Sequence, residues 1–300
     1  MLDIEKVLTD ERTCRALTGQ NISSIYNLLP MFEEALISFK SNKKDRKRAI
    51  GGGQKGKLPT TKGKLVFILI YLKVYPTYDL FGVLTNRSRS KCCESVKQLL
   101  PILEQALGKS CVLPKRKIKS LREFYSSFGD LKDIFIDGAE RPVQRPKNTK
   151  KQRKLYSGKK KSHTRKNIVA CDHGRKILFL SPTKSGRRHD KKLLDKSEFI
   201  YNISPDTCLW GDTGFKGIQD KHANTLIPHK RSKSNKLTES QKSENKVISS
   251  FRVVVEHAIG GIKRYGAARD IYRNKIDNLD DKFHLLSAGL WNFHLLNNAK

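Results

Sequence analysis

The chain has 300 residues, and 61 Lys and Arg stand against 29 Asp and Glu, for a formal net charge of +32. That length fits one large domain or two ordinary ones, and so positive a field favours nucleic acid as partner. Zinc-site spacing of cysteine, a bilayer-spanning apolar run and a signal-peptide pattern are all missing from the sequence. We therefore expect a cytosolic protein near nucleic acid. The net charge alone would also fit a protein that binds RNA or DNA without catalysing a reaction.

The first part of the chain predicts helices. Apolar residues three and four apart indicate a helix within residues 1–40, and a basic, glycine-containing stretch at 43–57 predicts a linker. Further helices are expected over 60–74, 78–83 and 88–107. Asn86, which tolerates left-handed backbone, lies in the turn between the last two, and Ser88 suits the N-cap that follows. Residues 1–125 are thus expected to form a helical N-terminal region.

Short strands replace this pattern from residue 134 onward. They are expected over 134–137, 167–172, 176–180, 207–211 and 225–228. His173-Gly174 predicts a tight turn that joins the second and third strands as a hairpin. A short helix over 189–196, a polar loop over 229–246 and two closing helices over 247–265 and 279–297 complete the pattern. A hairpin combined with strand–helix alternation predicts an α/β layer fold with a mixed sheet over residues 126–300.

Two acids follow buried-type strands. Asp137 comes directly after the apolar residues 134–136, and Asp212 ends the stretch 208–211. Such a run is typical of a central strand, and its carboxyl end is the usual position of a ligand site on an open α/β sheet. The alternative is that both acids are ordinary turn residues, since Asp-Gly and Asp-Thr-Gly form turns readily.

A third acid, Glu256, belongs to a predicted helix. The apolar stripe of that helix is Phe251, Val255, Ala258, Ile259 and Ile262. Arg252, Glu256 and Lys263 lie along one edge of the stripe. The alternative to a functional role for Glu256 is a weak i,i+4 ion pair with Arg252. Gly260-Gly261 costs about 1 kcal/mol per residue in a helix, which suggests close approach by another backbone or by substrate.

Carboxylates from two strand ends and one helix can converge on divalent cations. Hard cations such as Mg²⁺ take oxygen ligands and usually keep waters and substrate phosphates in their shell. A pair of such ions can hold the attacking and leaving oxygens of an in-line phosphoryl displacement. With the positive charge of the chain, this chemistry points to a nucleic acid substrate.

Several sequence blocks carry a resemblance to a known family. They are residues 137–146, 156–164 with Lys166-Asn167, 180–182, 189–194, 211–217, 227–230 and 252–264. In this order they resemble insertion-sequence transposases of the DDE class, in the subgroup that shares its catalytic domain with eukaryotic Harbinger-type transposases. The resemblance covers roughly residues 134–297.

The resemblance implies a ribonuclease H-like catalytic domain. Asp137, Asp212 and Glu256 would be its catalytic triad and the ligands of two Mg²⁺ or Mn²⁺ ions, with Arg252 and Lys263 offsetting phosphate charge. It implies a transposase that cleaves element ends and joins the freed 3′-OH to target DNA. The expected partners are double-stranded DNA, as terminal inverted repeats and target, and a second copy in a dimer on DNA. The expected location is the bacterial cytoplasm, associated with the nucleoid.

The same resemblance implies a helix-turn-helix within residues 60–108. Its second helix would enter the major groove. The N-terminal turn of that helix carries side chains suited to phosphates and guanine edges, namely Arg87, Ser88, Arg89, Ser90 and Lys91. Arg87 stands where the family has a small apolar anchor, which puts base specificity in doubt. The alternative is a merely structural helical bundle.

A basic run between the first two strands is expected to touch DNA phosphates. Residues 147–166 hold ten Lys or Arg and no acid. Lys159 and His163 are expected nearest the active site, and the other predicted DNA contacts in this half of the chain are Arg145, Lys160, Lys161, Arg252, Lys263 and Arg264. The alternative is a solvated loop. His189, before Asp190, is either a helix-start residue or a proton carrier.

Two rival functions stay open at this point. One is a metal-dependent DNA nuclease that cuts without strand transfer. The other is a domesticated, catalytically silent DNA-binding protein, against which the intact acid set argues.

Overall fold

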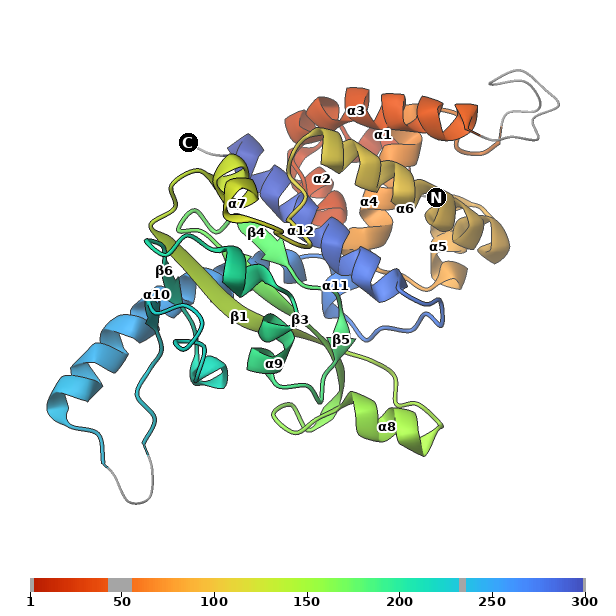
Figure 1. The fold of residues 1–300 in the computed structure, drawn as a ribbon. Helices are drawn as coiled ribbons and strands as arrows, with labels where there is room; N and C mark the ends of the chain where they lie inside the picture. The colour runs from red at the N-terminus through yellow and green to blue at the C-terminus, as the bar shows by residue number, and fades with distance from the viewer. Residues whose placement is uncertain (1–2, 43–55, 232–235, 299–300) are drawn as a thin grey trace. The chain divides into compact units, whose positions relative to one another are not determined.

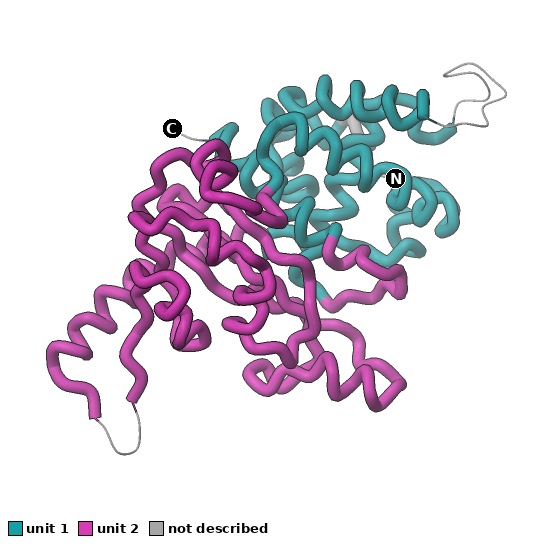
Figure 2. Tube along the Cα trace, viewed as in Figure 1, with its two compact units in different colours: residues 1–113, 263–270, 282–300 teal, residues 114–262, 271–281 magenta. Residues whose placement is uncertain are grey.

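The computed structural model describes residues 3–42, 56–231 and 236–298, so most of the expected linker lies outside the described residues. The chain forms two compact units, shown in Figure 2. A helical unit comprises Met1–Leu113, Lys263–Asp270 and Lys282–Lys300, and a sheet unit comprises Pro114–Ile262 and Ile271–Asp281. We expected a boundary at residue 125 with every later residue in the second domain, whereas two late segments belong to the helical unit.

The helical unit is built around one apolar helix. Its elements are α1 (Ile4–Val7), α2 (Glu11–Thr18), α3 (Ile22–Ser41), α4 (Thr61–Val74), α5 (Tyr78–Thr85), α6 (Arg89–Lys109), α11 (Gly266–Arg269) and most of α12 (Leu279–Asn298) (Figure 1). Residues 65–72 of α4 are all buried, as expected for a helix that is apolar on every side. Phe283 of α12 packs against Tyr71 and Tyr75, which explains why this late helix belongs to the helical unit.

The turn between α5 and α6 has the predicted chemistry. Asn86 adopts the left-handed conformation with φ of 51°. Ser88 is the N-cap of α6, and its side chain accepts a hydrogen bond from the backbone N–H of Lys91. A Cβ at Gly82 would lie 2.6 Å from the carbonyl oxygen of Arg87, so only glycine allows the turn to pass this close. The predicted turn is therefore confirmed at Asn86 and Ser88.

The sheet unit contains a seven-stranded mixed sheet. Its strands are β1 (Asp133–Pro142), β2 (Tyr156–Ser157), β3 (Ser162–Cys171), β4 (Ile177–Leu180), β5 (Lys184–Ser185), β6 (Cys208–Trp210) and β7 (Thr225–Leu226). The main order is β2-β3-β1-β6-β7, and β4 and β5 also pair with β3. β1 runs antiparallel to β3 but parallel to β6, which itself runs parallel to β7. The expected mixed α/β fold and the β3–β4 hairpin are confirmed.

The first strand is longer than its sequence predicts. We expected β1 to end at Asp137, but it stays paired with β3 as far as Pro142, opposite Thr164. Its pairing with β6 stops at Phe135, opposite Trp210. Asp137 therefore lies in mid-strand, just beyond the point where β6 leaves the sheet.

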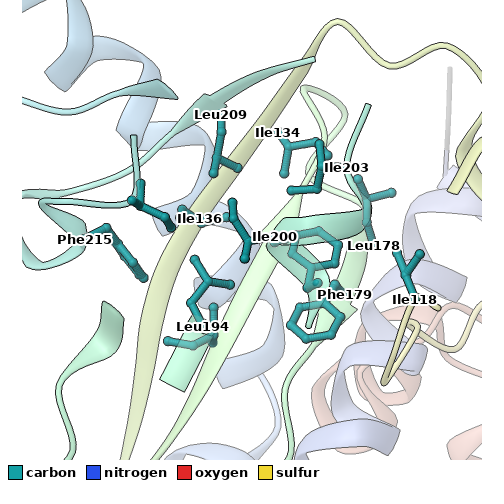
Figure 3. Close-up of a cluster of buried hydrophobic side chains, with 14 of the residues drawn as sticks. Ile118, Ile134, Ile136, Leu178, Phe179, Leu194, Ile200, Ile203, Leu209 and Phe215 are labelled. Carbon is teal, nitrogen blue, oxygen red and sulfur yellow. The ribbon is translucent and has the colours of Figure 1, made fainter. Parts of the chain in front are cut away.

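The two faces of the sheet are covered differently. One face carries the main apolar core, to which Ile134, Ile136 and Leu209 contribute (Figure 3). That core is closed by α7 (Leu121–Phe128), α9 (Asp190–Asp195) and a 3₁₀ turn, η1 (Phe199–Asn202). On the other face α10 (Glu239–Lys263) packs through Phe251, whose ring centroid lies 4.4 Å from that of Trp210 and 6.4 Å from that of Phe135.

One stretch that we expected to be a loop contains helix, and so does the basic run. The predicted polar loop over 229–246 is wrong at its end, because α10 begins at Glu239. Thr238 and Gln241 exchange side-chain to backbone hydrogen bonds there, a capping box whose signature was visible in the sequence. The basic run includes α8 (Thr149–Leu155) before β2.

Over the described residues, no helix has both the length and the apolar character that crossing a membrane requires.

Candidate active site

Asp137 lies on the sheet face that α10 covers. Side chains alternate along a strand, so Asp137 shares its face with Phe135, whose ring stacks on Phe251 of α10. The side chain is partly buried, and its Oδ1 accepts a hydrogen bond of 2.6 Å from the backbone N–H of Gly138. The strand and this contact hold the carboxylate at the edge where β6 has ended.

Asp212 lies just beyond the end of the neighbouring strand, β6. It follows Trp210 by two residues, as Asp137 follows Phe135, and both aromatic rings pack against Phe251. Its Oδ1 accepts a hydrogen bond of 2.6 Å from the N–H of Gly214, at the start of the 3₁₀ turn η2 (Thr213–Phe215). Only 14% of the Asp212 side chain is exposed. The two acids thus point from adjacent strands into the same region.

Charges around this region act on Asp137 from several elements. Burial raises the pKa of Asp137 above its ordinary value, and the nearby charge of Asp212 adds to this. The Gly138 N–H, Lys159 and Arg252 act in the opposite direction on the same pKa. Lys159 Nζ lies 3.8 Å from Asp212 Oδ2. Two carboxylates are therefore held close together, with a lysine from the basic run and an arginine from α10 beside them.

Glu256 occupies the next turn of α10 after Arg252. Its side chain is 56% exposed, and Arg252 Nη2 lies 3.6 Å from its Oε1, so the i,i+4 pair considered above is present. The predicted apolar stripe is confirmed, since Val255, Ala258, Ile259 and Ile262 are buried. A Cβ at Gly260 would meet nothing within 4 Å, so no other backbone among the described residues approaches this glycine closely, and approach by substrate stays a prediction.

The donor set suits a hard cation only in part. Asp137 and Asp212 offer carboxylate oxygens, the ligands that Mg²⁺ and Mn²⁺ prefer. Within the described residues, no three His, Cys, Asp or Glu side chains are gathered closely enough to hold a metal ion. The structure thus brings together two acids of the predicted triad and leaves Glu256 on the adjoining helix.

Comparisons with known proteins show the family of the chain. A family described as DDE superfamily endonuclease matches residues 136–292, a range that includes all three predicted acids. The chain belongs to this family. It is also 30% identical over 254 residues to the probable transposase for insertion sequence element IS702 of Microchaete diplosiphon, covering 84% of this chain and 87% of that protein. No solved structure matches the chain significantly.

Membership confirms the resemblance to DDE-class insertion-sequence transposases. The protein is therefore an enzyme of an endonuclease family whose members act on DNA and use divalent metal ions.

The basic run of this DDE endonuclease borders two open cavities. One, of about 650 Å³, is lined by Arg145, Gln152, Arg153, Tyr156, Gly158, His163 and Arg187. The other, of about 490 Å³, is lined by Lys150, Arg153, Lys154, Ser185, Arg187, Arg188, His189 and Lys192. Lys160 and Lys161 are exposed. His189 precedes α9 and makes no side-chain capping bond.

The remaining predicted DNA contacts lie in the helical unit. Ser88, Arg89, Ser90 and Lys91 form the exposed start of α6. Arg87 differs from them, because its guanidinium lies 5.3 Å from the Phe67 ring centroid and donates to Ser95 Oγ. Arg87 therefore packs against the protein at the position where the family has a small apolar residue. Lys263 is the last residue of α10, and Arg264 lies over the Trp291 ring.

Three charged residues close to the acids were not predicted from the sequence. Glu140, Lys166 and Asp190 are joined by ion pairs on the sheet face opposite Asp137. We had counted Lys166 in the basic run that touches DNA, but its side chain is only 6% exposed. This assignment is wrong because Lys166 lies within β3, directly opposite Glu140. Only the strand register could have revealed the pair.

Proposed function

We propose that this enzyme is a transposase that cleaves the ends of an insertion element and joins the freed 3′-OH to target DNA. The observation that carries the proposal is the pairing of Asp137 and Asp212 on one sheet face, beside Lys159 and Arg252. The extended similarity to an insertion-sequence transposase supports the same function. We also propose that the sheet unit has the ribonuclease H-like fold, because antiparallel strands are continued by parallel β6 and β7.

In this proposal Asp137, Asp212 and Glu256 hold two divalent ions, Mg²⁺ or Mn²⁺. Bound ions of this kind polarise the phosphate and activate the attacking water or hydroxyl. The protein contributes two partly buried carboxylates, each oriented by a glycine N–H. Arg252 and Lys159 would offset charge on the phosphate that enters between them. Lys263 is proposed to act in the same way.

Glu256 can serve as the third ligand for a geometric reason. After α10 the chain returns as Tyr272, which pairs in parallel with Val143 just beyond β1. Because α10 also packs on Phe135 through Phe251, we infer that α10 passes along β1 in the same direction. Glu256 follows Phe251 by about 7.5 Å of helix rise, and Asp137 follows Phe135 by about 6.6 Å of strand. Because Phe251 and Phe135 stack, we propose that the two acids lie at similar heights along the sheet. Substrate or metal would draw the exposed Glu256 away from Arg252 and inward.

DNA recognition is proposed to be divided between the units. The α5–α6 turn would act as a helix-turn-helix, with Ser88, Arg89, Ser90 and Lys91 on the inverted repeat. The basic run would contact phosphates through Arg145, Lys159, Lys160, Lys161 and His163, and Arg264 would add a further contact. Bringing two element ends together requires more than one copy, so we propose a dimer on DNA.

The experiment follows both steps on one substrate. Full-length protein is incubated with Mg²⁺, a target plasmid and a labelled duplex that carries the terminal sequence flanking its own gene. We expect cleavage at the element end and label joined to the plasmid, both abolished by EDTA. Cleavage without joined product would favour a nuclease. Specific binding with no cleavage in Mg²⁺ or Mn²⁺ would favour a silent DNA-binding protein.

A further inference from the structure

A buried cluster of charges lies on the sheet face opposite Asp137. Lys166 Nζ is 3.1 Å from Glu140 Oε1 and 2.9 Å from Asp190 Oδ1. The exposed fractions of these three side chains are 6% for Lys166, 6% for Glu140 and 12% for Asp190. Thr164 Oγ1 donates a 2.7 Å hydrogen bond to Glu140 Oε2, so the second oxygen of Glu140 is also engaged.

Burial of this kind is costly, so it needs a reason. Moving charges out of water costs several kcal/mol per ion, and apolar residues of the same volume often give equal or greater stability. The cluster is therefore a poor means of stabilising the sheet. Its position indicates another role, because Glu140 belongs to β1, Lys166 to β3 and Asp190 to the start of α9.

Asp190 contacts the backbone beside both acids. A Cβ at Gly138, next to Asp137, would lie 2.8 Å from Asp190 Oδ1. A Cβ at Gly214, whose N–H donates to Asp212, would lie 3.5 Å from Asp190 Oδ2. The Asp190 carboxylate thus packs against the two glycines whose N–H groups orient the acids.

We propose that Lys166 and Asp190, braced by Glu140, are positioning residues that hold the backbones of Asp137 and Asp212 at the separation needed for metal binding. This inference rests on the proposed function, because it assumes that the two acids hold divalent ions. Lys166 fixes Asp190 through the ion pair. Asp190 supports Gly138 from the sheet face opposite Asp137, and it also packs against Gly214.

Lys166→Met separates positioning from simple electrostatics. Removing a positive charge near the acids would by itself tighten the binding of a cation, whereas loss of positioning would weaken it. Mn²⁺ binding to the full-length protein without DNA is measured by electron paramagnetic resonance. We expect about tenfold weaker binding or more, the usual cost of removing a residue that supports metal ligands. Unchanged or tighter binding would overturn the proposal.

The chain offers a matched control, a second lysine that forms an ion pair with a residue of α9. Lys221 Nζ lies 2.9 Å from Asp195 Oδ1 at the far end of α9, and neither residue supplies the atoms nearest to a Cβ at Gly138 or Gly214. Lys221→Met should therefore leave Mn²⁺ affinity unchanged. An equal loss in both lysine variants would show a general disturbance of α9 and would overturn the specific role of Lys166.

A second variant guards against misfolding. Asp190→Asn keeps the shape of the side chain and leaves Lys166 balanced by Glu140, so circular dichroism should show a folded protein. It too should bind Mn²⁺ about tenfold more weakly, and Asp195→Asn should not. If Lys166→Met fails to fold, this second pair decides, and equal Mn²⁺ affinity of Asp190→Asn and wild type overturns the proposal.

Failure of the inference can be told apart from failure of the proposed function. Asp137→Asn tests the latter in the same titration. If wild type and Asp137→Asn bind Mn²⁺ alike, the proposed metal site is wrong, and the inference falls with it. If Asp137→Asn loses binding while Lys166→Met and Asp190→Asn keep it, only the positioning role is wrong.

Discussion

At the scale of single residues, two carboxylates owe their orientation to glycines. Gly138 and Gly214 each donate a backbone N–H to the neighbouring acid, and each would crowd Asp190 or Asp212 if it carried a Cβ. Phe135 and Trp210, two residues before the acids, share Phe251 of α10 as a packing partner. Trp210 is fixed further by a 2.6 Å hydrogen bond from its Nε1 to Asp133 Oδ1. The aromatic layer thus sets the spacing on which the site depends.

His294 gives a residue-scale prediction for the helical unit. Burial lowers the pKa of His294 to about 4, and the charges of Arg264 and Arg15 act in the same direction. The unfolded chain, with an ordinary histidine pKa of about 6.5, binds the proton more readily. The contribution of neutral His294 to stability is therefore present above pH 6.5 and is lost as the pH falls towards 4.

Chemical denaturation between pH 7 and pH 4 tests this. His294→Gln, which cannot titrate, should lose less stability over this range than wild type. Parallel curves for the two proteins would show that His294 does not carry the dependence.

At the scale of elements, two arginines at the α5–α6 turn have different surroundings, one packed within the protein and one exposed. Arg87 lies over Phe67 and donates to Ser95, whereas Arg89 is 72% exposed with only a 3.7 Å pairing to Asp79. Arg87→Ala should therefore lower the melting temperature by a few degrees, since it removes about 1 kcal/mol of cation–π interaction. Arg89→Ala should leave melting unchanged and weaken binding to inverted-repeat DNA about tenfold, as expected when one phosphate or base contact is removed.

Calorimetry and footprinting on the same preparations distinguish these outcomes. If Arg87→Ala melts like wild type but loses the footprint, Arg87 contacts DNA rather than anchoring the turn.

Local signals allowed this turn to be predicted in advance. Asn86 and Ser88 have side chains that favour a left-handed residue and an N-cap, and both preferences act over a few residues. The start of α10 carried an equally local signal at Thr238 and Gln241 that we overlooked. The extension of β1 had no such signal, because Glu140 and Arg141 look like exposed residues until β3 pairs with them.

The candidate site divides in the same way. Glu256 stays a prediction. The proximity of Asp137 and Asp212 could be predicted, because each follows an apolar run in the sequence. The ion pair of Lys166 and Asp190 could not be predicted, because the sequence does not show whether a charged residue is buried or exposed to solvent. Burial of Lys166 depends on register with Glu140 and on where α9 begins.

At the scale of the whole molecule, the net charge of +32 is expected to act through phosphates. Replacing Lys159, Lys160 and Lys161 together with Ala leaves up to three phosphates without a bound cation from the protein. The slope of log K against log salt should flatten by about 0.9 for each such phosphate on duplex DNA. Affinity should fall by similar factors for inverted-repeat and random DNA, because phosphate contacts position without specifying sequence.

Fluorescence-anisotropy titrations over a range of salt concentrations provide the measurement. Lys242→Ala is a suitable control, since Lys242 is an exposed α10 lysine paired with Glu239. An unchanged slope in the triple variant would mean that residues 159–161 form a solvated segment away from DNA.

The central claim is that Asp137, Asp212 and Glu256 together carry metal-dependent cleavage. The most direct measurement is the rate of Mg²⁺-dependent cleavage of a duplex with the element end by Asp137→Asn, Asp212→Asn and Glu256→Gln, beside DNA affinity for each. Each variant should bind DNA like wild type and cleave at less than about a hundredth of its rate, because removing one charged ligand empties or misplaces an ion. Cleavage above that level by any of the three variants would remove the residue concerned from the catalytic set, and for Asp137 or Asp212 it would contradict the account as a whole.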